Sequence, residues 1–185
     1  LCTGYGADII SAAFGSTYKG LTIEYSRETK PLGTGGAIRN AIPHIKTDHI
    51  LIMNGDSYIN VDLKIYIKWH FQNQIDVSLL LTKVSDASRY GRVDVDKNGL
   101  VKKFVEKGEV ATPGWINAGV YILKKHLIAK KTKGKPFSME HEFFPYIVGK
   151  GLLYGFKFKG SFIDIGLPAS YDVADRFFKM KENIL

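Results

Sequence analysis

The sequence contains few of the residues that cross-link small proteins or that cluster around metal ions. It contains a single cysteine, Cys2, which excludes an internal disulfide framework and suits a reducing compartment such as the cytoplasm. Its five histidines are scattered, without a ligand spacing such as His-Glu-x-x-His. We therefore expect neither covalent catalysis by a cysteine nor a histidine-based metal site.

Long apolar runs and a secretory signal are missing as well. No apolar stretch approaches the length of a membrane span, so a soluble, cytoplasmic protein without membrane contact is expected. The sequence starts at Leu1 with a pattern that resembles the end of a strand running into a helix. We expect the natural protein to have a further N-terminal segment.

Positive charge is in excess, with a formal net charge of +8. Nucleic-acid binding is one interpretation of such a charge. However, the sequence has no aromatic-interleaved RNA motif and no metal-finger spacing, and much of the charge lies in "KKHLIAKKTKGK", residues 124–135. A basic domain also attracts small polyphosphate substrates, and we expect no nucleic-acid partner.

Strand and helix patterns alternate along the chain. Strands are expected at 21–26, 49–54, 76–84, 116–123, 152–160 and 161–166, with a hairpin centred on Asn98-Gly99. Helices are expected at 7–14, at 35–42, after the capping residue Asp62, at 138–148 with a break at Pro145, and from Pro168 onward, where Tyr171, Ala174 and Phe178 would be buried. The alternation predicts one α/β domain over 1–185, a Rossmann-like three-layer α/β/α sandwich with a mostly parallel mixed sheet.

A glycine-rich stretch, "KPLGTGGAIRN", stands directly before a helical pattern. Three glycines, Gly33, Gly35 and Gly36, fall within four residues. A plain helix entry would need one glycine, whereas three favour a backbone that approaches a ligand closely and offers N–H donors to it. We expect these glycines to clear space for a ligand.

Two aspartates follow apolar runs that are far apart in the sequence. Asp56 ends "ILIMNGD", and Asp164 lies in "SFIDIG". Each has a plain alternative, because Asn-Gly-Asp is good turn chemistry and an aspartate before Gly-Leu-Pro prepares a helix entry. Ligands of α/β proteins gather at the carboxyl ends of strands, and Mg²⁺ binds one or two carboxylates together with water and substrate phosphate. The pair therefore predicts a magnesium site.

The motifs "KPLGTGGAI", "ILIMNGDSYI", "RYGRVDVD", "FVEK", "INAGVYIL" and "SFIDIGLPASY" occur in the order that is seen in the sugar-1-phosphate nucleotidyltransferases. The resemblance extends over residues 1 to about 175. It is greatest to the guanylyltransferases that act on D-glycero-α-D-manno-heptose 1-phosphate or mannose 1-phosphate.

The resemblance implies a reaction and a set of site residues. A sugar 1-phosphate attacks the α-phosphorus of a nucleoside triphosphate, and pyrophosphate leaves, with Mg²⁺ held by the catalytic residues Asp56 and Asp164. The residues that correspond to nucleotide contacts are Leu32, Gly33, Thr34, Gly35, Gly36, Asn54 and Gly55. Those that correspond to sugar-phosphate contacts are Gly91, Glu106, Lys107, Asn117 and Ala118. Glu140 matches a further acidic position, although a first helical turn favours glutamate in any case.

One part of the family pattern has no counterpart in residues 1–185. The family begins with a strand and a loop containing Gly-x-Gly-Thr-Arg, and we expect the natural protein to carry this segment. The alternative is a non-catalytic relative that binds nucleotide or sugar phosphate and regulates a partner. The favoured substrate pair is GTP with a heptose 1-phosphate, and the product would serve the synthesis of a surface polysaccharide. Mannose or glucose 1-phosphate with another nucleoside triphosphate is the alternative. A homo-oligomeric state is possible as well.

Overall fold

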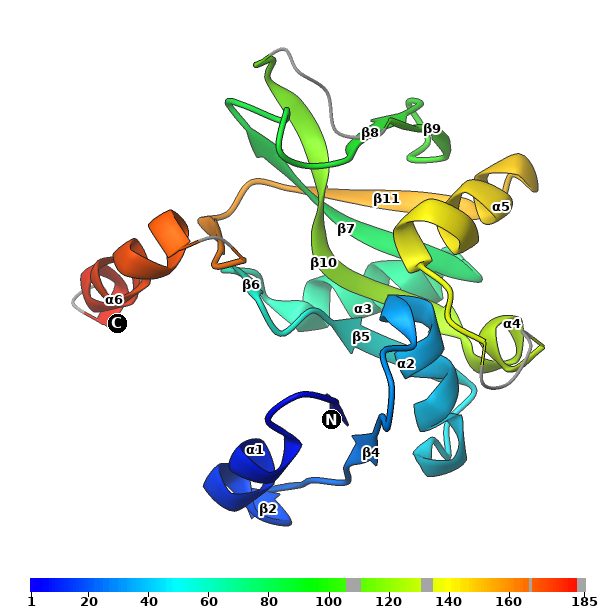
Figure 1. Ribbon diagram of the computed structural model, residues 1–185. Helices are drawn as coiled ribbons and strands as arrows, with labels where there is room; N and C mark the ends of the chain where they lie inside the picture. Colours follow the sequence, from blue (N-terminus) through cyan, green and yellow to red (C-terminus); the bar gives the residue numbers. More distant parts are fainter. Residues whose placement is uncertain (106–110, 131–134, 167, 183–185) are drawn as a thin grey trace. The chain divides into compact units, whose positions relative to one another are not determined.

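The computed structural model describes residues 1–105, 111–130, 135–166 and 168–182 (Figure 1). The chain forms two compact units. Unit 1 comprises Leu1–Ile50 and Leu123–Tyr146, and unit 2 comprises Leu51–Ile122 and Ile147–Leu185. Strands and helices alternate in sequence order, so the predicted α/β class is confirmed.

Unit 1 combines small parallel and antiparallel strand pairs with short helices. β1 (Cys2–Thr3) pairs in parallel with β4 (Ser26–Arg27), and β2 (Thr17–Tyr18) pairs antiparallel with β3 (Leu21–Thr22). Its helices are α1 (Ala7–Phe14), α2 (Gly33–Ala41) with the 3₁₀ turn η1 (Ile42–His44), α4 (Lys125–Ala129) and the π-helix η2 (Met139–Phe143). The expected helix over 7–14 is confirmed, and it ends at Gly15 with φ 62°.

The single strand expected over residues 21–26 is wrong. This stretch contributes to two strands, because its partners change half-way. The Ile23 N–H closes the β2–β3 hairpin by donating to the Ser16 carbonyl at 2.8 Å, and the Ser26 N–H donates to the Leu1 carbonyl at 2.8 Å. The chain therefore leaves one two-stranded sheet and enters another within a few residues.

Unit 2 is built around a mixed sheet with the strand order β11-β7-β10-β8-β9, in which β5 also pairs with β10. The strands are β5 (His49–Met53), β7 (Val77–Val84), β8 (Arg92–Val95), β9 (Val101–Val105), β10 (Gly114–Lys124) and β11 (Leu153–Phe158). β11 lies parallel to β7, and β8 is antiparallel to β9 and β10. The hairpin expected at Asn98-Gly99 is confirmed, with Gly99 at φ 83°.

Smaller elements complete this unit. β6 (Ser57–Ile59) pairs antiparallel with β12 (Phe162–Asp164). The helices are α3 (Leu63–Gln72), α5 (Phe144–Gly149) and α6 (Pro168–Glu182). The helix expected over 138–148 is confirmed, and it changes from the π-helix η2 to the α-helix α5 between Phe143 and Phe144, shortly before Pro145. Among the described residues, no helix is both long and apolar enough to cross a bilayer.

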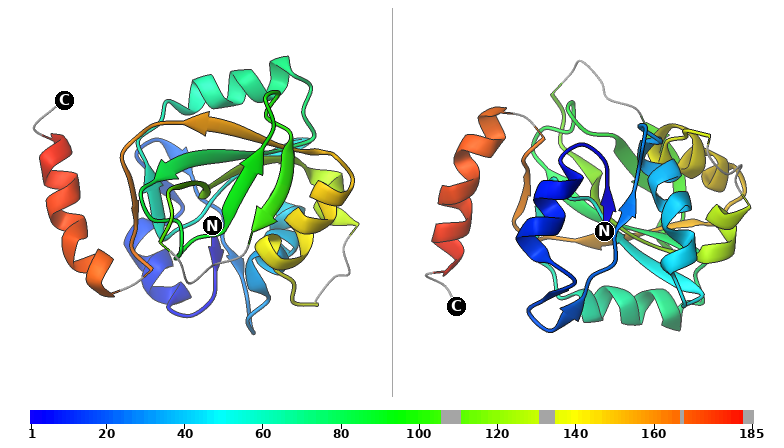
Figure 2. Two further views of the ribbon diagram at one scale, coloured as in Figure 1. Left: turned by 90° about the horizontal axis from the view of Figure 1, so that it is seen from above. Right: turned by 60° about the horizontal axis from the view of Figure 1, so that its bottom comes forward.

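α3 covers one face of the sheet in unit 2 (Figure 2). Tyr66 packs in a cluster with Leu80 of β7 and with Ala118, Val120 and Ile122 of β10. Asp62 caps the helix as expected, because its side chain accepts a hydrogen bond from the Lys64 N–H at 2.8 Å. The helix is thus fixed at its start and along its buried face.

Two elements expose apolar side chains, and one of them was expected to bury them. In β5, Leu51 and Met53 are 39% and 57% exposed, so this strand alternates in burial although its residues form an apolar run. In α6, Tyr171 is 66% and Phe178 39% exposed. The contact of α6 lies with the β6–β12 pair, where Tyr58 meets Phe177 and Phe178 edge-on, and the helix otherwise projects from unit 2 (Figure 2).

Candidate active site

The two predicted carboxylates lie together at the β6–β12 pair of unit 2. Asp56 directly precedes β6 and Asp164 ends β12, where it pairs in register with Ser57. The Ile165 N–H donates to the Asp56 carbonyl at 2.7 Å, and the Gly166 N–H donates to Asp164 Oδ1 at 2.9 Å. One point, where a Cβ on Gly166 would stand, is 3.2 Å from Asp164 Oδ1 and 3.7 Å from Asp56 Oδ2. Two distant parts of the sequence therefore converge on one small space.

The turn that carries Asp56 is fixed to the middle of β10. The Asn54 N–H donates to the Gly119 carbonyl at 2.8 Å, and the Tyr121 hydroxyl donates to Asn54 Oδ1. Gly119 has φ 76°, and a Cβ there would collide with Ser57 Oγ and stand 3.1 Å from the Asn54 Cβ. Local sequence around Gly119, in "INAGVY", does not indicate this role, because the close approach arises only in the fold.

The expected sugar contacts on β10 belong to the same neighbourhood. Asn117 Oδ1 accepts the Gly119 N–H at 3.0 Å, and the Ala118 carbonyl accepts the Ser57 hydroxyl at 3.5 Å. Gly91 directly precedes β8. The predicted contacts Glu106 and Lys107 lie outside the described residues.

Tyr90 is a neighbour of the carboxylates that the sequence did not single out. Its ring meets Phe162 of β12 edge-on, with centroids 5.8 Å apart, and the Arg89 guanidinium lies over it at 5.7 Å. Burial, and then the negative charge of Asp164, raise the pKa of the Tyr90 hydroxyl. The tyrosine therefore stays protonated beside Asp164 at neutral pH.

The glycine loop belongs to unit 1, where it opens α2. Gly33 has φ 71°, and a Cβ there would lie 2.7 Å from the Phe137 carbonyl oxygen. A Cβ on Gly35 would collide with the Phe137 ring, and one on Gly36 would lie 2.8 Å from the Leu32 Cβ. At these three positions, the space that a side chain would need is occupied by Phe137 or Leu32. The binding role of the loop stays a prediction.

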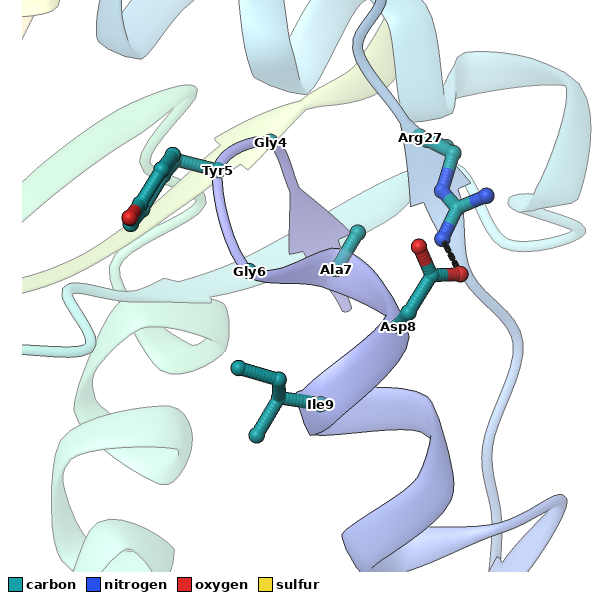
Figure 3. Close-up of a pocket in the computed structure, with 7 residues that line it drawn as sticks. All are labelled: Gly4, Tyr5, Gly6, Ala7, Asp8, Ile9 and Arg27. Atoms are coloured by element: carbon teal, nitrogen blue, oxygen red, sulfur yellow. Dashed lines mark hydrogen bonds and ion pairs between the residues drawn. The ribbon is translucent and has the colours of Figure 1, made fainter.

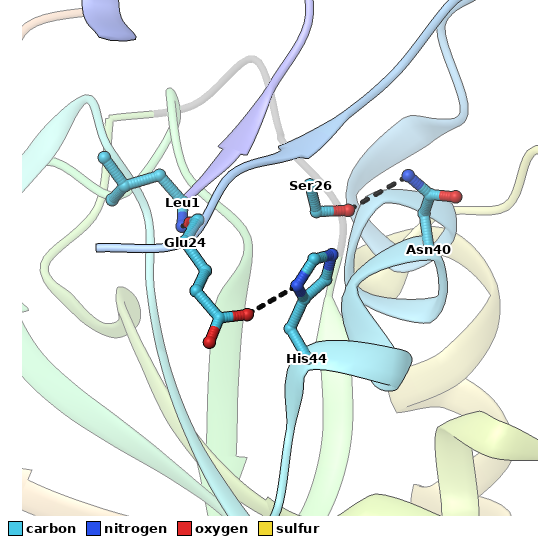
Figure 4. A network of polar contacts seen from close by, with 5 residues as sticks. All are labelled: Leu1, Glu24, Ser26, Asn40 and His44. Carbon is cyan, nitrogen blue, oxygen red and sulfur yellow. Dashed lines mark hydrogen bonds and ion pairs between the residues drawn. The ribbon is translucent and has the colours of Figure 1, made fainter. Parts of the chain in front are cut away.

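Polar contacts anchor α2 to the strand segment before it (Figure 4). Asn40 Nδ2 donates to Ser26 Oγ at 3.0 Å, and His44 Nδ1 lies 2.6 Å from Glu24 Oε2. The backbone nitrogen of Leu1 donates to the Glu24 carbonyl at 2.6 Å. The helix that begins at the glycine loop is therefore held by polar contacts near its C-terminal end.

Unit 1 also has a pocket at the carboxyl ends of the parallel strands β1 and β4 (Figure 3). It is lined by Gly4, Tyr5, Gly6, Ala7, Asp8, Ile9 and Arg27. Arg27 is paired with Asp8, and the fully exposed Tyr5 ring lies across the pocket from this pair (Figure 3). The Gly-Tyr-Gly sequence that follows β1 could have indicated this pocket. The pocket lies at the carboxyl ends of parallel strands, where α/β proteins bind ligands.

The donor set at Asp56 and Asp164 suits one kind of metal ion. Within the described part of the chain, no three or more His, Cys, Asp or Glu residues are grouped so that they could hold an ion. Structural zinc needs four ligands and catalytic zinc three, whereas Mg²⁺ is commonly held by one or two carboxylates and substrate phosphate. The two carboxylates that face one point fit magnesium in this respect.

A family model for nucleotidyl transferases matches residues 1–180. The chain belongs to this family. A D-glycero-alpha-D-manno-heptose 1-phosphate guanylyltransferase of Aneurinibacillus thermoaerophilus is 37% identical over 176 residues, which are 95% of this chain and 76% of that protein. A mannose-1-phosphate guanylyltransferase of Mycobacterium tuberculosis is 34% identical over 174 residues, and the chain spans 48% of its length.

A solved structure agrees with these relatives. The chain is similar to HddC from Yersinia pseudotuberculosis, crystallised in complex with GMP-PN, with a TM-score of 0.84 and 36% identity over 96% of this chain and 77% of that one. The expected nucleotidyltransferase fold is thereby confirmed.

Proposed function

We propose that the protein joins a sugar 1-phosphate to a nucleoside triphosphate, with heptose 1-phosphate and GTP as the favoured pair. The observation that carries the proposal is the convergence of Asp56 and Asp164 on one point from two separate strand ends. Membership of the nucleotidyl transferase family supports the reaction type. The name of the relative that is 37% identical to this chain supports heptose 1-phosphate and a guanylyl group.

The reaction exchanges one phosphoanhydride bond for another. A phosphate oxygen of the sugar 1-phosphate forms a bond to the α-phosphorus of the triphosphate. The bond from that phosphorus to the oxygen that bridges to the β-phosphate breaks, and pyrophosphate leaves with the electron pair. No covalent enzyme intermediate is needed, because catalysis here is positioning and charge stabilisation.

Asp56 and Asp164 would hold a magnesium ion, which supplies positive charge to phosphate oxygens when bound. The chain's own residues keep the two carboxylates in place: the Gly166 N–H orients Asp164, and the hydrogen bonds of Asn54 fix the turn before Asp56. Asn117 already uses its Oδ1 for the Gly119 N–H. Its side-chain NH₂ is then the group that donates to a sugar hydroxyl.

A matrix of substrates tests the proposal. Pyrophosphate release by the full-length protein is measured with GTP and three other nucleoside triphosphates, each against heptose, mannose and glucose 1-phosphates. We expect turnover with GTP and heptose 1-phosphate, and a mass spectrum that contains the GDP-sugar. Turnover with mannose 1-phosphate in its place, as the mycobacterial relative's name indicates, would replace the sugar in the proposal. A folded protein without any turnover would refute the reaction and favour a regulatory, nucleotide-binding role.

A further inference from the structure

The segment from Phe137 to Glu142 is hydrogen-bonded to the first turn of α2 within unit 1. The N–H groups of Gly35 and Gly36 both donate to the Phe137 carbonyl, at 3.0 and 3.3 Å. In return, the Phe137 N–H donates to the Leu32 carbonyl at 3.0 Å. The glycine loop is therefore bonded through its backbone to a segment about 100 residues later in the sequence.

The side chain of Thr34 makes a second connection between the same two segments. Its hydroxyl donates to Glu140 Oε2 at 2.8 Å and accepts the Met139 N–H at 2.9 Å. A hydroxyl has a single hydrogen, which Thr34 donates to Glu140. The lone pairs of the Thr34 oxygen are then what accepts the Met139 N–H. Because a carboxylate only accepts, Glu140 determines the orientation of the Thr34 hydroxyl.

Glu140 is itself held in place, next to a second glutamate that serves a different purpose. Glu140 Oε2 also accepts the Ser138 hydroxyl at 3.0 Å, and Ser138 Oγ caps η2 by accepting the Glu140 and His141 N–H groups at 3.1 Å. Glu142 Oε1 accepts the Ser138 N–H at 3.0 Å. Both glutamates thus stabilise the start of η2, and Glu140 also contacts the glycine loop through Thr34.

We infer that Glu140 is a positioning residue for nucleotide binding, acting through Thr34 on the shape of the glycine loop. The inference rests on the proposed function, in which this loop contacts the nucleotide. Glu140 works as a hydrogen-bond acceptor, so its oxygen matters and its charge does not. This distinguishes it from a carboxylate that binds a metal ion or a substrate cation.

Steady-state kinetics of three variants test the role. Glu140→Ala is expected to raise KM for the triphosphate roughly tenfold, in line with the loss of one hydrogen bond, with KM for the sugar 1-phosphate within about twofold. Glu140→Gln keeps an accepting oxygen and should restore most of the affinity. Glu142→Ala is the matched control, because it removes a cap of the same helix without touching Thr34. An unchanged triphosphate KM in Glu140→Ala, or a Glu140→Gln variant as impaired as Glu140→Ala, would overturn the inference.

Amide hydrogen exchange separates this inference from the proposed function, because it needs no activity. In Glu140→Ala the amides of Gly35 and Gly36 should exchange at least several-fold faster than in the unchanged protein and in Glu142→Ala. If the unchanged protein shows no turnover but exchange responds in this way, the proposed reaction fails and the positioning contact stands. Equal exchange in all three proteins would refute the positioning contact whether or not the protein is an enzyme.

Discussion

Gly119 controls the position of Asp56 although it bears no side chain. It accepts the Asn54 N–H through its carbonyl, and its φ of 76° brings β10 against Ser57 and Asn54. Replacement by alanine combines an unfavourable backbone conformation with a steric clash. The turn from Asn54 to Asp56 has to move if a Cβ is added.

We predict that Gly119→Ala lowers the free energy of unfolding by about 2 kcal/mol and lowers kcat with it. Urea unfolding and the turnover assay measure the two effects. Gly149→Ala is a suitable control, since a Cβ on Gly149 would meet nothing within 4 Å. Equal stability of the two variants would show that β10 tolerates a side chain at this position.

At the scale of residues, the sequence indicated the two carboxylates but not the residues that surround and position them. Asp56 and Asp164 stood out because each follows a recognisable apolar run, and the structure brings them together. Tyr90 and Gly119 did not stand out, because their roles arise from contacts between strands that are distant in sequence. For the same reason the packing of Phe137 against the glycine loop could not be anticipated.

Among the elements, α3 and β7 share a buried polar network. The Tyr66 hydroxyl and His70 Nδ1 each lie 2.8 Å from Ser78 Oγ, and all three side chains are buried. Burial raises the pKa of the Tyr66 hydroxyl well above its ordinary value, although its hydrogen bond with Ser78 opposes the shift. The folded protein therefore holds this proton more tightly than the unfolded chain does.

This difference predicts a loss of stability in alkali. The contribution of Tyr66 is fully present below about pH 10, where tyrosine titrates in an unfolded chain, and decreases as the pH rises above that value. Tyr66→Phe should cost about 1 kcal/mol at pH 8 through the lost hydrogen bond but should show a weaker decline toward pH 11. Urea midpoints at both values measure the decline. Parallel declines in the two proteins would show that Tyr66 is not responsible.

Element types were more predictable than element partners. Three features follow from local patterns and are present: the buried strand β7, the Asn98-Gly99 hairpin and the Asp62 cap. The split of residues 21–26 between two sheets depends on β1 and β2 as partners, which local patterns do not encode. The exposure of α6 likewise depends on how little of unit 2 it touches.

For the whole molecule, the net charge of +8 bears on the substrates. Both proposed substrates are phosphate anions, and a positive protein attracts them over a distance set by salt screening. We predict that KM for the triphosphate rises several-fold between about 0.05 and 0.5 M KCl, with a smaller change in kcat. A neutral osmolyte at the same osmolarity is the control. A KM that is independent of salt would show that the charge lies away from the path of the substrates.

The most direct measurement is the magnesium dependence of turnover in the full-length protein and in two isosteric variants, Asp56→Asn and Asp164→Asn, with Asp62→Asn as a control that keeps its cap. We expect magnesium-dependent turnover that falls at least a hundredfold, an order of magnitude typical for the loss of a group that stabilises transition-state charge, in the first two variants and not in the control. Either variant retaining full activity would show that the carboxylate pair is not the catalytic centre.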